Sequence, residues 1–356
     1  MGLVRRLRGP VRIVCPGSSR VLGGRLDEVV PRHGGGRRRP VRRVNTGQER
    51  ALPPSSAPGV TLLVVVSYGS AALLEQNLGA MTLPPGVEVV VVDCFTSVPE
   101  RERLARAASR HGWQAVLLDD NRGFGGGVNA GAALASDLGA DVIATLNPDA
   151  TIDAASLERL IDHARAHPDA LVSPRIVGSL GTTWFEGADL YLDDGSTAGA
   201  RHRADRASRP RRPWATGACF ALSSELWRRL GGFDERYFLY WEDIDLSHRV
   251  LDLGGRLELL PEATVIHEEG QTHGRQAGDR AKTPLYYRYN IRNRLLYAAL
   301  HLDKVGQRRW AMSAPRVAYG VLLQGGRRQL LHAGPWQAYV AGLWQGWGLL
   351  RRHRVH

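Results

Sequence analysis

Cysteine and long apolar runs are both scarce in this chain of 356 residues. The three cysteines, Cys15, Cys94 and Cys219, are too few and too scattered for a disulfide framework or a thiolate zinc site. We therefore expect a reducing compartment. No stretch holds 18 consecutive apolar residues, and the N-terminal residues lack the apolar core of a secretory signal. The sequence therefore predicts neither a membrane-spanning helix nor a secretory signal.

Several common catalytic motifs are missing as well. The chain has no P-loop GxxxxGK, no HExxH pair, no CxxC pair and no serine nucleophile elbow. Acyl transfer, P-loop phosphoryl transfer and zinc-dependent hydrolysis therefore lack the groups on which they usually depend. The composition, with 43% hydrophobic and 23% charged residues, is that of an ordinary globular protein, which excludes disorder of the whole chain.

Positive charge is concentrated at the two ends of the chain. Residues 1–50 hold 13 arginines against three acidic residues, and residues 301–356 hold nine basic residues against one acidic residue. Because the whole chain carries only +12, its middle is mildly acidic. This is not the pattern of a nucleic-acid-binding domain. It indicates a catalytic body whose ends contact an anionic partner.

Strands and helices are predicted to alternate from residue 60 onward. Residues 1–57 are rich in Arg, Gly and Pro without a sustained period, so we interpret them as a basic tail without regular structure; a translation start further along the chain is an alternative. Apolar runs typical of buried parallel strands and the helical stretches between them then follow one another, with strands at 61–67, 87–93, 115–118 and 141–146 and helices near 70–81, 99–111 and 121–138. This order predicts a doubly wound, mostly parallel α/β sheet.

Polar residues follow the predicted strands at their carboxyl ends, where such sheets bind ligands. The glycine-rich segment 121–129 either lets backbone amides approach a phosphate or forms a tight strand-to-helix turn. Asn147 and Asp149 lie two residues apart and point to the same side of an extended chain, so they can share a cation; a turn that ends the strand is the alternative.

Acidic residues are densest between Trp241 and Leu246. If Glu242 begins a helix, Glu242, Asp245 and Arg249 share one face, and Asp243 points elsewhere. A carboxylate in such a first turn suits a general base, although acidic residues at a helix start also offset the helix dipole. His267 follows a strand-like segment and is a further candidate metal ligand, or an ordinary surface residue beside two glutamates.

In order along residues 60–275, these segments resemble the family 2 glycosyltransferases with a GT-A fold, in particular the rhamnosyltransferase-like and galactofuranosyltransferase-like bacterial branch. Each motif is modest, but the ordered set is specific. The matching segments are Val64-Val-Val-Ser-Tyr68, Val91-Val-Asp93, Asn121-x-Gly-Phe-Gly-x-Gly-x-Asn129, Leu146-Asn-Pro-Asp149, Gly217-Ala-Cys219, Gly231-Gly-Phe-Asp-Glu235, Trp241-Glu-Asp-Ile-Asp-Leu246 and His267-x-x-Gly270.

The resemblance implies a role for each of these positions. Asp243 is expected to be the catalytic base with Glu242 beside it, and Trp241 is expected to line the acceptor site. Asp149 and His267 are expected to hold Mg²⁺ or Mn²⁺. The nucleotide-sugar site is expected to involve Ser67, Tyr68, Asp93, Asn121, Gly123, Phe124, Gly125, Asn129 and Asn147.

Two positions depart from the family pattern. Cys94 stands where the family often has Asn, and Asn147 stands at the first position of the DxD-like motif, which leaves Asp149 as its acidic residue. The expected reaction is an inverting single displacement from a nucleoside diphosphate sugar to a hydroxyl of a growing glycan or lipid-linked acceptor in cell-surface polysaccharide synthesis. A non-catalytic sugar-nucleotide or polysaccharide binding module is the alternative, and a nucleotidyltransferase is a second one whose usual glycine- and lysine-rich signature is missing near Ser67.

The C-terminal residues predict a helical, basic extension at 276–356, after a glycosyltransferase domain at 58–275. Apolar residues recur at intervals of 4, 3, 4 and 3 within its last helix, at Trp336, Val340, Leu343, Trp347 and Leu350. Arginine pairs flank this stretch, so we predict a helix that lies on an anionic membrane surface; a core helix packed on the catalytic domain is the alternative. The expected location is cytoplasmic, peripheral on the inner face of the plasma membrane.

Overall fold

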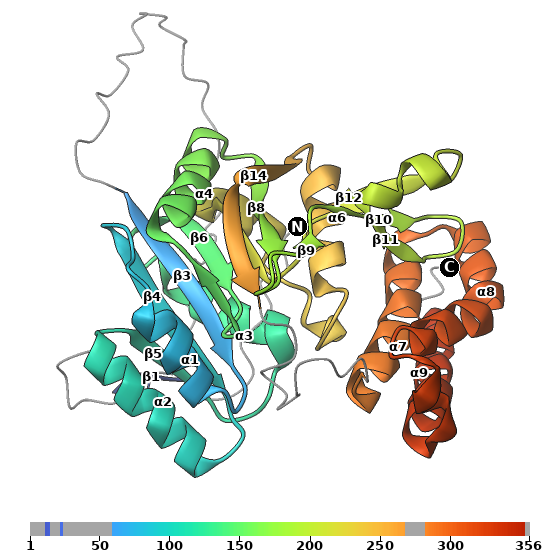
Figure 1. Ribbon diagram of the computed structural model, residues 1–356, viewed down its shortest axis with the longest axis horizontal. Coiled ribbons are helices and arrows are strands. Elements are labelled where there is room, and N and C mark those ends of the chain that lie inside the picture. The colour runs from blue at the N-terminus through green and yellow to red at the C-terminus, as the bar shows by residue number, and fades with distance from the viewer. Residues whose placement is uncertain (1–10, 15–21, 24–58, 268–281, 353–356) are drawn as a thin grey trace, which may run out of the picture.

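A mixed β-sheet organises the N-terminal two thirds of the chain in the computed structural model, which describes residues 11–14, 22–23, 59–267 and 282–352 (Figure 1). The strand order is β2-β1-β5-β4-β3-β6-β13-β8-β14-β7, and β9 pairs with β8. The strands are β1 (Val11–Val14), β2 (Leu22–Gly23), β3 (Val60–Ser67), β4 (Val87–Cys94), β5 (Gln114–Leu118), β6 (Ala140–Leu146), β7 (Ala150–Ile152), β8 (Ala170–Val177), β9 (Thr183–Phe185), β13 (Cys219–Ser223) and β14 (Arg256–His267).

Helices cover both faces of this sheet, as the strand–helix alternation predicts. Along β3, Leu63 and Val65 pack with the helices of one layer, and Leu62 and Val64 pack with those of the other, because successive side chains point to opposite faces. The first layer holds α1 (Ala71–Asn77), α2 (Val98–His111) and α4 (Ala154–Ala166), and the second holds α3 (Gly123–Ala132), α5 (Ser224–Leu230) and α6 (Glu242–Asp252).

The sheet is mostly parallel in strand direction but not throughout. The four strands β5, β4, β3 and β6 pair in parallel, as predicted. Strand β13 then pairs antiparallel with both β6 and β8, and β14 returns parallel to β8. Because β13 lies between parallel neighbours, the segment before it, residues 216–218, reaches the sheet edge at which β6 ends.

The basic N-terminal tail differs from its prediction at two short segments. Residues 11–14 and 22–23 form β1 and β2, and β1 pairs antiparallel with β5 at the edge of the sheet. Three of the four residues in Val-Arg-Ile-Val are β-branched, which favours an extended conformation beside an open strand edge. The remaining residues of the predicted tail lie outside the described part of the chain.

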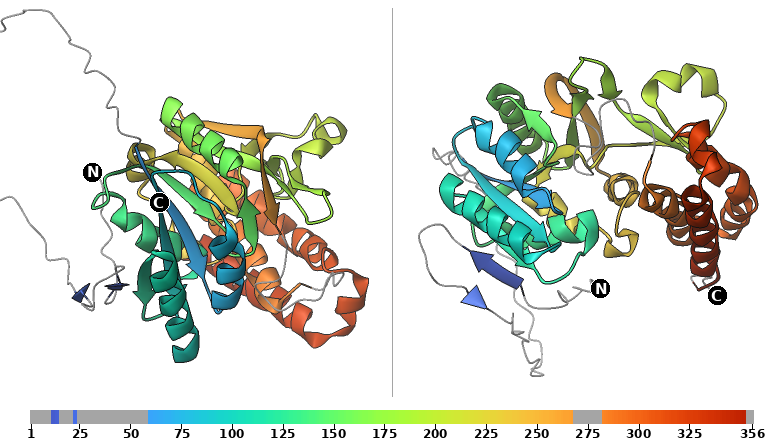
Figure 2. Two further views of the ribbon diagram at one scale, coloured as in Figure 1. Left: turned by 60° about the vertical axis from the view of Figure 1, so that its left-hand side comes forward. Right: turned by 60° about the horizontal axis from the view of Figure 1, so that its bottom comes forward.

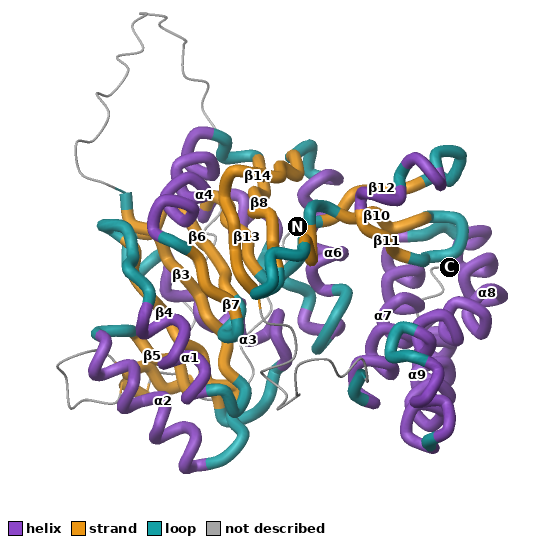
Figure 3. The backbone as a smooth tube through the Cα atoms, viewed as in Figure 1, coloured by secondary structure: helices purple, strands orange, loops and turns teal. Residues whose placement is uncertain are grey.

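Three helices form the C-terminal region: α7 (Pro284–His301), α8 (Lys304–Leu323) and α9 (Ala333–Arg352). They stand to one side of the large sheet, next to a small sheet of β10 (Ala188–Tyr191), β11 (Thr197–Gly199) and β12 (Arg211–Trp214) (Figure 2). Figure 3 shows these helices in purple and the strands of both sheets in orange. Their core also includes Leu190, Tyr237, Trp241 and Ile244, so it continues into the segment before α6.

The predicted apolar face of α9 is partly buried and partly exposed in the structure. Leu343 and Leu350 are buried in the core with α7, whereas Trp336 and Val340 are exposed. Glycines cause this orientation: a Cβ on Gly346 would lie 2.6 Å from a Leu295 side-chain atom, so α7 and α9 approach along the glycine side. The helix therefore packs as a core helix on one side and presents apolar side chains on another.

None of the helices within residues 59–267 and 282–352 combines the length and the apolar character that a membrane span needs.

Candidate functional site

Two neighbouring strands bring Ser67 and Asp93 together at the carboxyl edge of the sheet. Ser67 of β3 and Asp93 of β4 are register partners, and both are buried. Burial raises the pKa of the Asp93 carboxyl, although its ion pair with Arg101 at 2.7 Å opposes the shift. Tyr68 follows with 46% of its surface exposed, so its ring is accessible to a ligand at this edge.

The glycines of α3 serve close packing inside the protein. A Cβ on Gly123, whose φ is +74°, would lie 1.8 Å from the Phe238 carbonyl oxygen, and one on Gly125 would lie 2.9 Å from the Phe233 side chain. Asn121 accepts a hydrogen bond from the Gly123 amide, and Phe124 packs edge-on against Phe233. These contacts fit the tight strand-to-helix turn that the sequence offered as one interpretation of this segment, and the approach of its backbone amides to a phosphate stays a prediction.

Asn129, at the end of the same motif, is engaged within the protein. Its side-chain oxygen accepts a hydrogen bond from the backbone amide of Phe233 at 2.8 Å. Its side-chain nitrogen donates hydrogen bonds to the Phe233 carbonyl at 2.9 Å and to the Glu235 carboxylate at 3.2 Å. Gly232 must be glycine at this contact, because φ is +74° and a Cβ would lie 2.4 Å from the Asn129 oxygen. The two glycine-containing motifs of the sequence therefore dock on each other.

Asp149 and His267 meet at the end of β6 and β14. Their Oδ1 and Nε2 atoms are 3.0 Å apart, and both side chains are about 95% buried. The Asn147 side-chain nitrogen lies 3.5 Å from the same imidazole nitrogen. Adjacent ligands of an octahedral ion held at about 2.0–2.1 Å lie about 2.9 Å apart, so the separation between Asp149 and His267 fits a pair of cation ligands.

The donor set at this point also suits a cation. A carboxylate, an imidazole and an amide converge there, and the chemistry of this set suits Mn²⁺ and tolerates Mg²⁺. His267 has its other ring nitrogen, Nδ1, buried without a hydrogen-bond partner among the described residues, and its ring packs edge-on against Trp184. The segment that follows His267, residues 268–281, lies outside the described part of the chain.

Asp243 lies in the first turn of α6 and is held by backbone amides. Gly217 donates to one carboxylate oxygen at 3.1 Å, and Ile244 donates to the other at 2.8 Å. As the helical spacing predicts, Asp245 points elsewhere, and it is buried in ion pairs with Arg249 and His301, both at 2.7 Å. Burial raises the pKa of Asp245, but the bonds from His301 and Arg249 outweigh burial and lower it.

Glu242 and Asp243 are adjacent acids, of which Glu242 is buried and Asp243 is partly exposed. Burial raises the pKa of Asp243 to about 6, and the amides of Gly217 and Ile244 limit the shift. Burial and the neighbouring charge of Asp243 raise the pKa of Glu242 well above its ordinary value, and its Oε2 atom has no partner among the described residues. Asp243 is therefore the stronger acid of the pair and is the one that ionises near neutral pH.

A short backbone segment links the two acidic positions. The backbone amide of Asn147 donates to the Ala218 carbonyl at 2.9 Å, and the backbone amide of the adjacent Gly217 donates to the Asp243 carboxylate at 3.1 Å. Asp243 and the backbone of Asn147, two residues before Asp149, are thus both bonded to residues 217–218, which precede β13. The structure therefore brings Asn147, Asp149, His267 and Asp243 to the same edge of the sheet.

The loop before α6 is conformationally strained. Phe238, Tyr240 and Trp241 all have positive φ, at 58°, 63° and 76°, which costs roughly 1–3 kcal/mol for each such residue. Asn293 of α7 holds this loop: its side-chain amide donates to the carbonyls of Tyr237, Leu239 and Tyr240 at 2.7–2.8 Å.

Asn293 is not among the predicted site residues. It is completely buried and comes from a helix about 50 residues after the loop that it holds. The available signal was a polar pair, Arg292-Asn293, within an otherwise apolar and aromatic helix; Arg292 also donates to the Arg236 carbonyl at 3.0 Å.

Trp241 faces the C-terminal helices. Only 6% of its surface is exposed, and its ring packs against Tyr297 and Trp310. Its contacts are those of a core residue that anchors the start of α6, and its role toward the acceptor stays a prediction.

Comparisons with known proteins agree with this arrangement. Residues 63–230 match the model of glycosyl transferase family 2. The N-acetylglucosaminyl-diphospho-decaprenol L-rhamnosyltransferase of Mycobacterium tuberculosis is 26% identical over 237 residues, which cover 60% of this chain and 77% of that protein. The low-salt glycan biosynthesis hexosyltransferase Agl10 of Haloferax volcanii is 26% identical over 196 residues, which cover 52% and 60% of the two chains.

Solved structures share the fold. The mannosyltransferase PcManGT of Pyrobaculum calidifontis, in complex with GDP-Man and Mn²⁺, aligns with a TM-score of 0.50 and 17% identity over 86% of this chain and 91% of its own. GalNAc-T7 with UDP, GalNAc and Mn²⁺ aligns with a TM-score of 0.54 and 16% identity over 76% and 53%. The fold and these relatives define the class: the chain is a glycosyltransferase with a GT-A fold.

The matched segment covers the sheet from β3 to α5. Together with the named relatives, this match supports the resemblance to family 2 glycosyltransferases that the ordered motifs predict. The predicted fold class is confirmed, with the mixed pairing around β13 as its main addition.

Replacing Asn293 with Ala should weaken both stability and turnover. The change leaves buried carbonyls of residues 237–240 without their donor, so we expect the free energy of unfolding to fall by about 3 kcal/mol and kcat to fall at least tenfold, with the KM for the sugar donor nearly unchanged. Thermal unfolding and steady-state kinetics measure these effects.

Asn290→Ala is the matched control, because Asn290 lies one turn earlier in α7 and, among the described residues, its side chain donates to the Tyr286 carbonyl of the same helix and not to the loop before α6. Equal losses of kcat in both variants, or a kcat in Asn293→Ala that matches the unmodified chain, would show that the loop does not depend on Asn293.

Proposed function

We propose that this enzyme transfers a sugar, with inversion, from a nucleoside diphosphate sugar to a hydroxyl group of a growing glycan or lipid-linked acceptor in cell-surface polysaccharide synthesis. The observation that carries the proposal is that Asp243 accepts from the Gly217 amide, while Asn147, two residues before Asp149, donates its backbone amide to the adjacent Ala218 carbonyl, so both acidic positions lie at one edge of the sheet. One position suits a cation that binds a diphosphate, and the other suits a base for the attacking hydroxyl. Residues 58–275 would form the catalytic domain, and residues 276–356 its helical extension.

The sugar donor is proposed to bind along the carboxyl edge of β3, β4 and β6. Ser67, Asp93 and the exposed ring of Tyr68 supply hydrogen-bonding and stacking groups for a nucleoside there. Asn121 and Phe124, at the start of α3, and Asn147, at the end of β6, would border the sugar and the diphosphate, with Gly123 and Gly125 permitting the close approach of Phe238 and Phe233. Complexes of the related folds hold UDP or GDP-Man, which supports this class of donor.

Asp149 and His267 are proposed to hold Mn²⁺ or Mg²⁺, with Asn147 beside them. When bound, the cation offsets the negative charge that grows on the departing nucleoside diphosphate. The 3.0 Å separation of the two ligand atoms supports this assignment, and so does the Mn²⁺ in both related complexes.

Asp243 is proposed to accept the proton of the acceptor hydroxyl as its oxygen attacks the anomeric carbon from the face opposite the leaving group. With a pKa of about 6, Asp243 is ionised at neutral pH and is still a stronger base than an ordinary aspartate. Glu242 keeps its proton longer and can donate a hydrogen bond beside it. A single displacement needs no carboxylate nucleophile, which distinguishes it from retaining hydrolysis.

The acceptor is proposed to be lipid-linked and to be reached at an anionic membrane. The rhamnosyltransferase relative is named for a decaprenol-diphosphate acceptor, which supports this class. An open depression on α9 is lined by Trp336, Gln337, Val340, Ala341 and Trp344, and Trp344 is 74% exposed. Tyr319 of α8 stacks on Trp336 and extends this apolar surface.

The charge of the same region complements an acidic bilayer. Residues 304–352 hold eight basic residues and no acidic residue. Two arginines precede the last helix and two end it, so the apolar side chains lie between cationic groups, which is the pattern of helices that lie in the membrane interface. We propose a cytoplasmic enzyme bound peripherally to the inner face of the plasma membrane.

Asp243→Asn should abolish turnover without abolishing donor binding. Loss of a general base lowers kcat by about 10²–10⁴-fold, whereas the nucleotide is proposed to bind elsewhere. In the unmodified enzyme, kcat/KM should fall as the pH drops through about 6, because a base must be unprotonated to act. Asp252→Asn, at the exposed end of α6, is the control; a variant at 243 that keeps its turnover would refute the assignment.

Removal of the cation by EDTA should stop the reaction, and added Mn²⁺ should restore it. Asp149→Asn should raise the Mn²⁺ concentration needed for half-maximal rate at least tenfold, because a neutral amide is a poorer ligand than a carboxylate. Asp162→Asn on the exposed surface of α4 serves as the control. Full activity after exhaustive treatment with EDTA would exclude the proposed requirement.

Trp344→Glu combined with Val340→Glu should release the enzyme from acidic vesicles. Burying a carboxylate in the interface is unfavourable, and the anionic lipid also repels it, so sedimentation with phosphatidylglycerol vesicles should fall at least tenfold. Leu180→Glu, on an exposed loop of the catalytic domain, introduces the same charge at a side chain that is 92% exposed. Binding of the double variant equal to that of the Leu180 control would contradict the proposed surface.

A further inference from the structure

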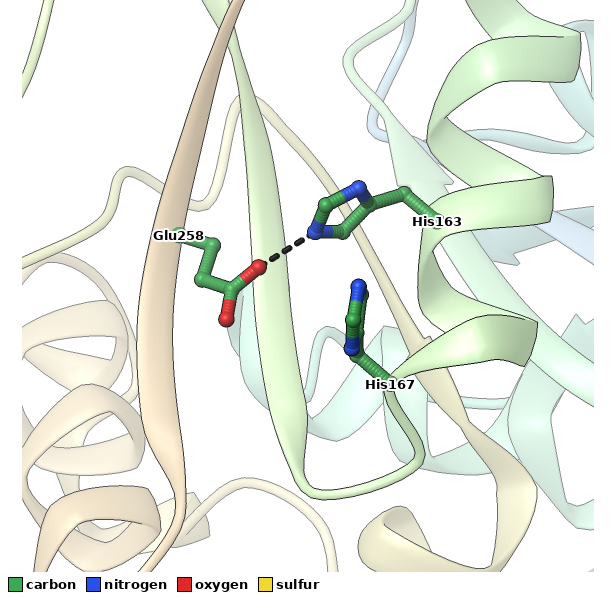
Figure 4. A group of neighbouring side chains, drawn as sticks. All are labelled: His163, His167 and Glu258. Atoms are coloured by element: carbon green, nitrogen blue, oxygen red, sulfur yellow. Dashed lines mark hydrogen bonds and ion pairs between the residues drawn. The ribbon is translucent and has the colours of Figure 1, made fainter.

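A group of two histidines and one glutamate lies at the end of β14 opposite to His267. His163 belongs to α4, His167 follows its last residue, and Glu258 is the third residue of β14 (Figure 4). Nine residues separate Glu258 from His267 along β14, which corresponds to roughly 30 Å of strand. The group is therefore separate from the proposed donor site.

The three side chains converge on one point. His163 Nε2 forms a hydrogen bond with Glu258 Oε2, and the two imidazole rings have centroids 4.4 Å apart. One potential ligand atom from each residue lies within 4.8 Å of the other two. Four ligands held at about 2.0–2.1 Å around a tetrahedral ion lie about 3.3 Å apart, so a contraction of about 1.5 Å in the widest pair completes the geometry. The side chains of His163 and Glu258 are 27% and 23% exposed, which leaves them room for this adjustment.

The helix spacing makes this arrangement specific. His163 and His167 are four residues apart, and the His167 amide donates to the His163 carbonyl at 2.9 Å, so the helical turn extends to His167. Histidines at i and i+4 share one face of a helix, which is the spacing by which helices bind zinc with two imidazoles.

The surrounding charges are compatible with a divalent cation. Arg256 bonds to the other oxygen of Glu258 at 3.0 Å, which orients the carboxylate and leaves Oε2 directed at His163. The same arginine pairs with Asp169 at 3.0 Å. With neutral imidazoles, the two acids and one arginine carry a net charge of −1, which a divalent ion reverses to +1. A hydrogen-bonded carboxylate of this kind is typical of the supporting groups around protein metal sites.

We propose that His163, His167 and Glu258 form a structural site for a transition-metal ion of the zinc class, separate from the Mn²⁺ or Mg²⁺ of the reaction. Two nitrogen ligands and one oxygen ligand suit Zn²⁺, with water as the fourth ligand, whereas Mg²⁺ prefers a shell of oxygen atoms. The ion would clamp the end of α4 to the start of β14, the strand whose other end carries His267.

The test measures zinc binding to the full-length chain without an affinity tag, in the absence of nucleotide. ZnCl₂ at a hundred times its Kd should raise the Tm of the unmodified protein by roughly 5 °C. The rise should disappear in H163Q/H167Q and in E258Q, and isothermal titration should show affinity at least tenfold weaker. The rise should persist in D149N and in H332Q, an exposed histidine outside the group.

A spectroscopic readout covers the case in which a variant does not fold. Cu²⁺ bound to the unmodified protein and to D149N should give an electron paramagnetic resonance signal with two coupled imidazole nitrogens, one from each histidine. A signal from a single imidazole that is lost in D149N would place the ion at the donor site and overturn the proposal. So would the absence of a zinc-dependent change in Tm, or the same change in H163Q/H167Q.

Discussion

The enzyme depends on one constraint, the placement of two neighbouring carboxylates, buried Glu242 and partly exposed Asp243, at the start of α6. To bring Glu242 and Asp243 to the sheet edge, the chain adopts positive φ at Phe238, Tyr240 and Trp241, a conformation that costs several kcal/mol in total. Asn293 offsets this cost with one side-chain amide that reaches three carbonyls. The carboxylates of Glu242 and Asp243 are thus held in position by a helix that lies outside the matched family segment.

This constraint makes the C-terminal helices part of the catalytic architecture. Trp241 packs on Tyr297 and Trp310, and Asp245 pairs with His301, so α6 contacts both the sheet and α7. Helix α9 carries the exposed Trp336 and Trp344, and residues 304–352 hold eight basic residues and no acidic residue. Helix α9 is therefore connected through α7 to the loop before α6, because these elements share one core.

The sequence predicted those features that depend on local periodicity. Buried runs such as 61–67 and 87–93 became β3 and β4 within one residue, because a strand covered on both faces is apolar throughout. The position of β13 was not predictable in this way, since its pairing with β6 and β8 joins segments far apart in the chain. The side of α9 that packs against α7 was also not predicted, because an apolar repeat does not reveal which side of a helix meets another helix. In the structure, α7 packs against the side that holds Gly342 and Gly346. Asn293 was missed for the same reason, as its partners are backbone atoms without a sequence signature.

The fold also determines which of the two carboxyls, Glu242 or Asp243, has the lower pKa. Glu242 and Asp243 share the same helix turn, and desolvation raises both pKa values. Only Asp243 accepts backbone amides on both oxygens, and one of these amides belongs to Gly217. A Cβ at that position would lie 3.0 Å from Phe124, so the approach that delivers the amide requires glycine or a displaced ring. The glycine of the Gly217-Ala-Cys219 motif thus helps to determine which carboxylate ionises first, and hence which one can act as the base.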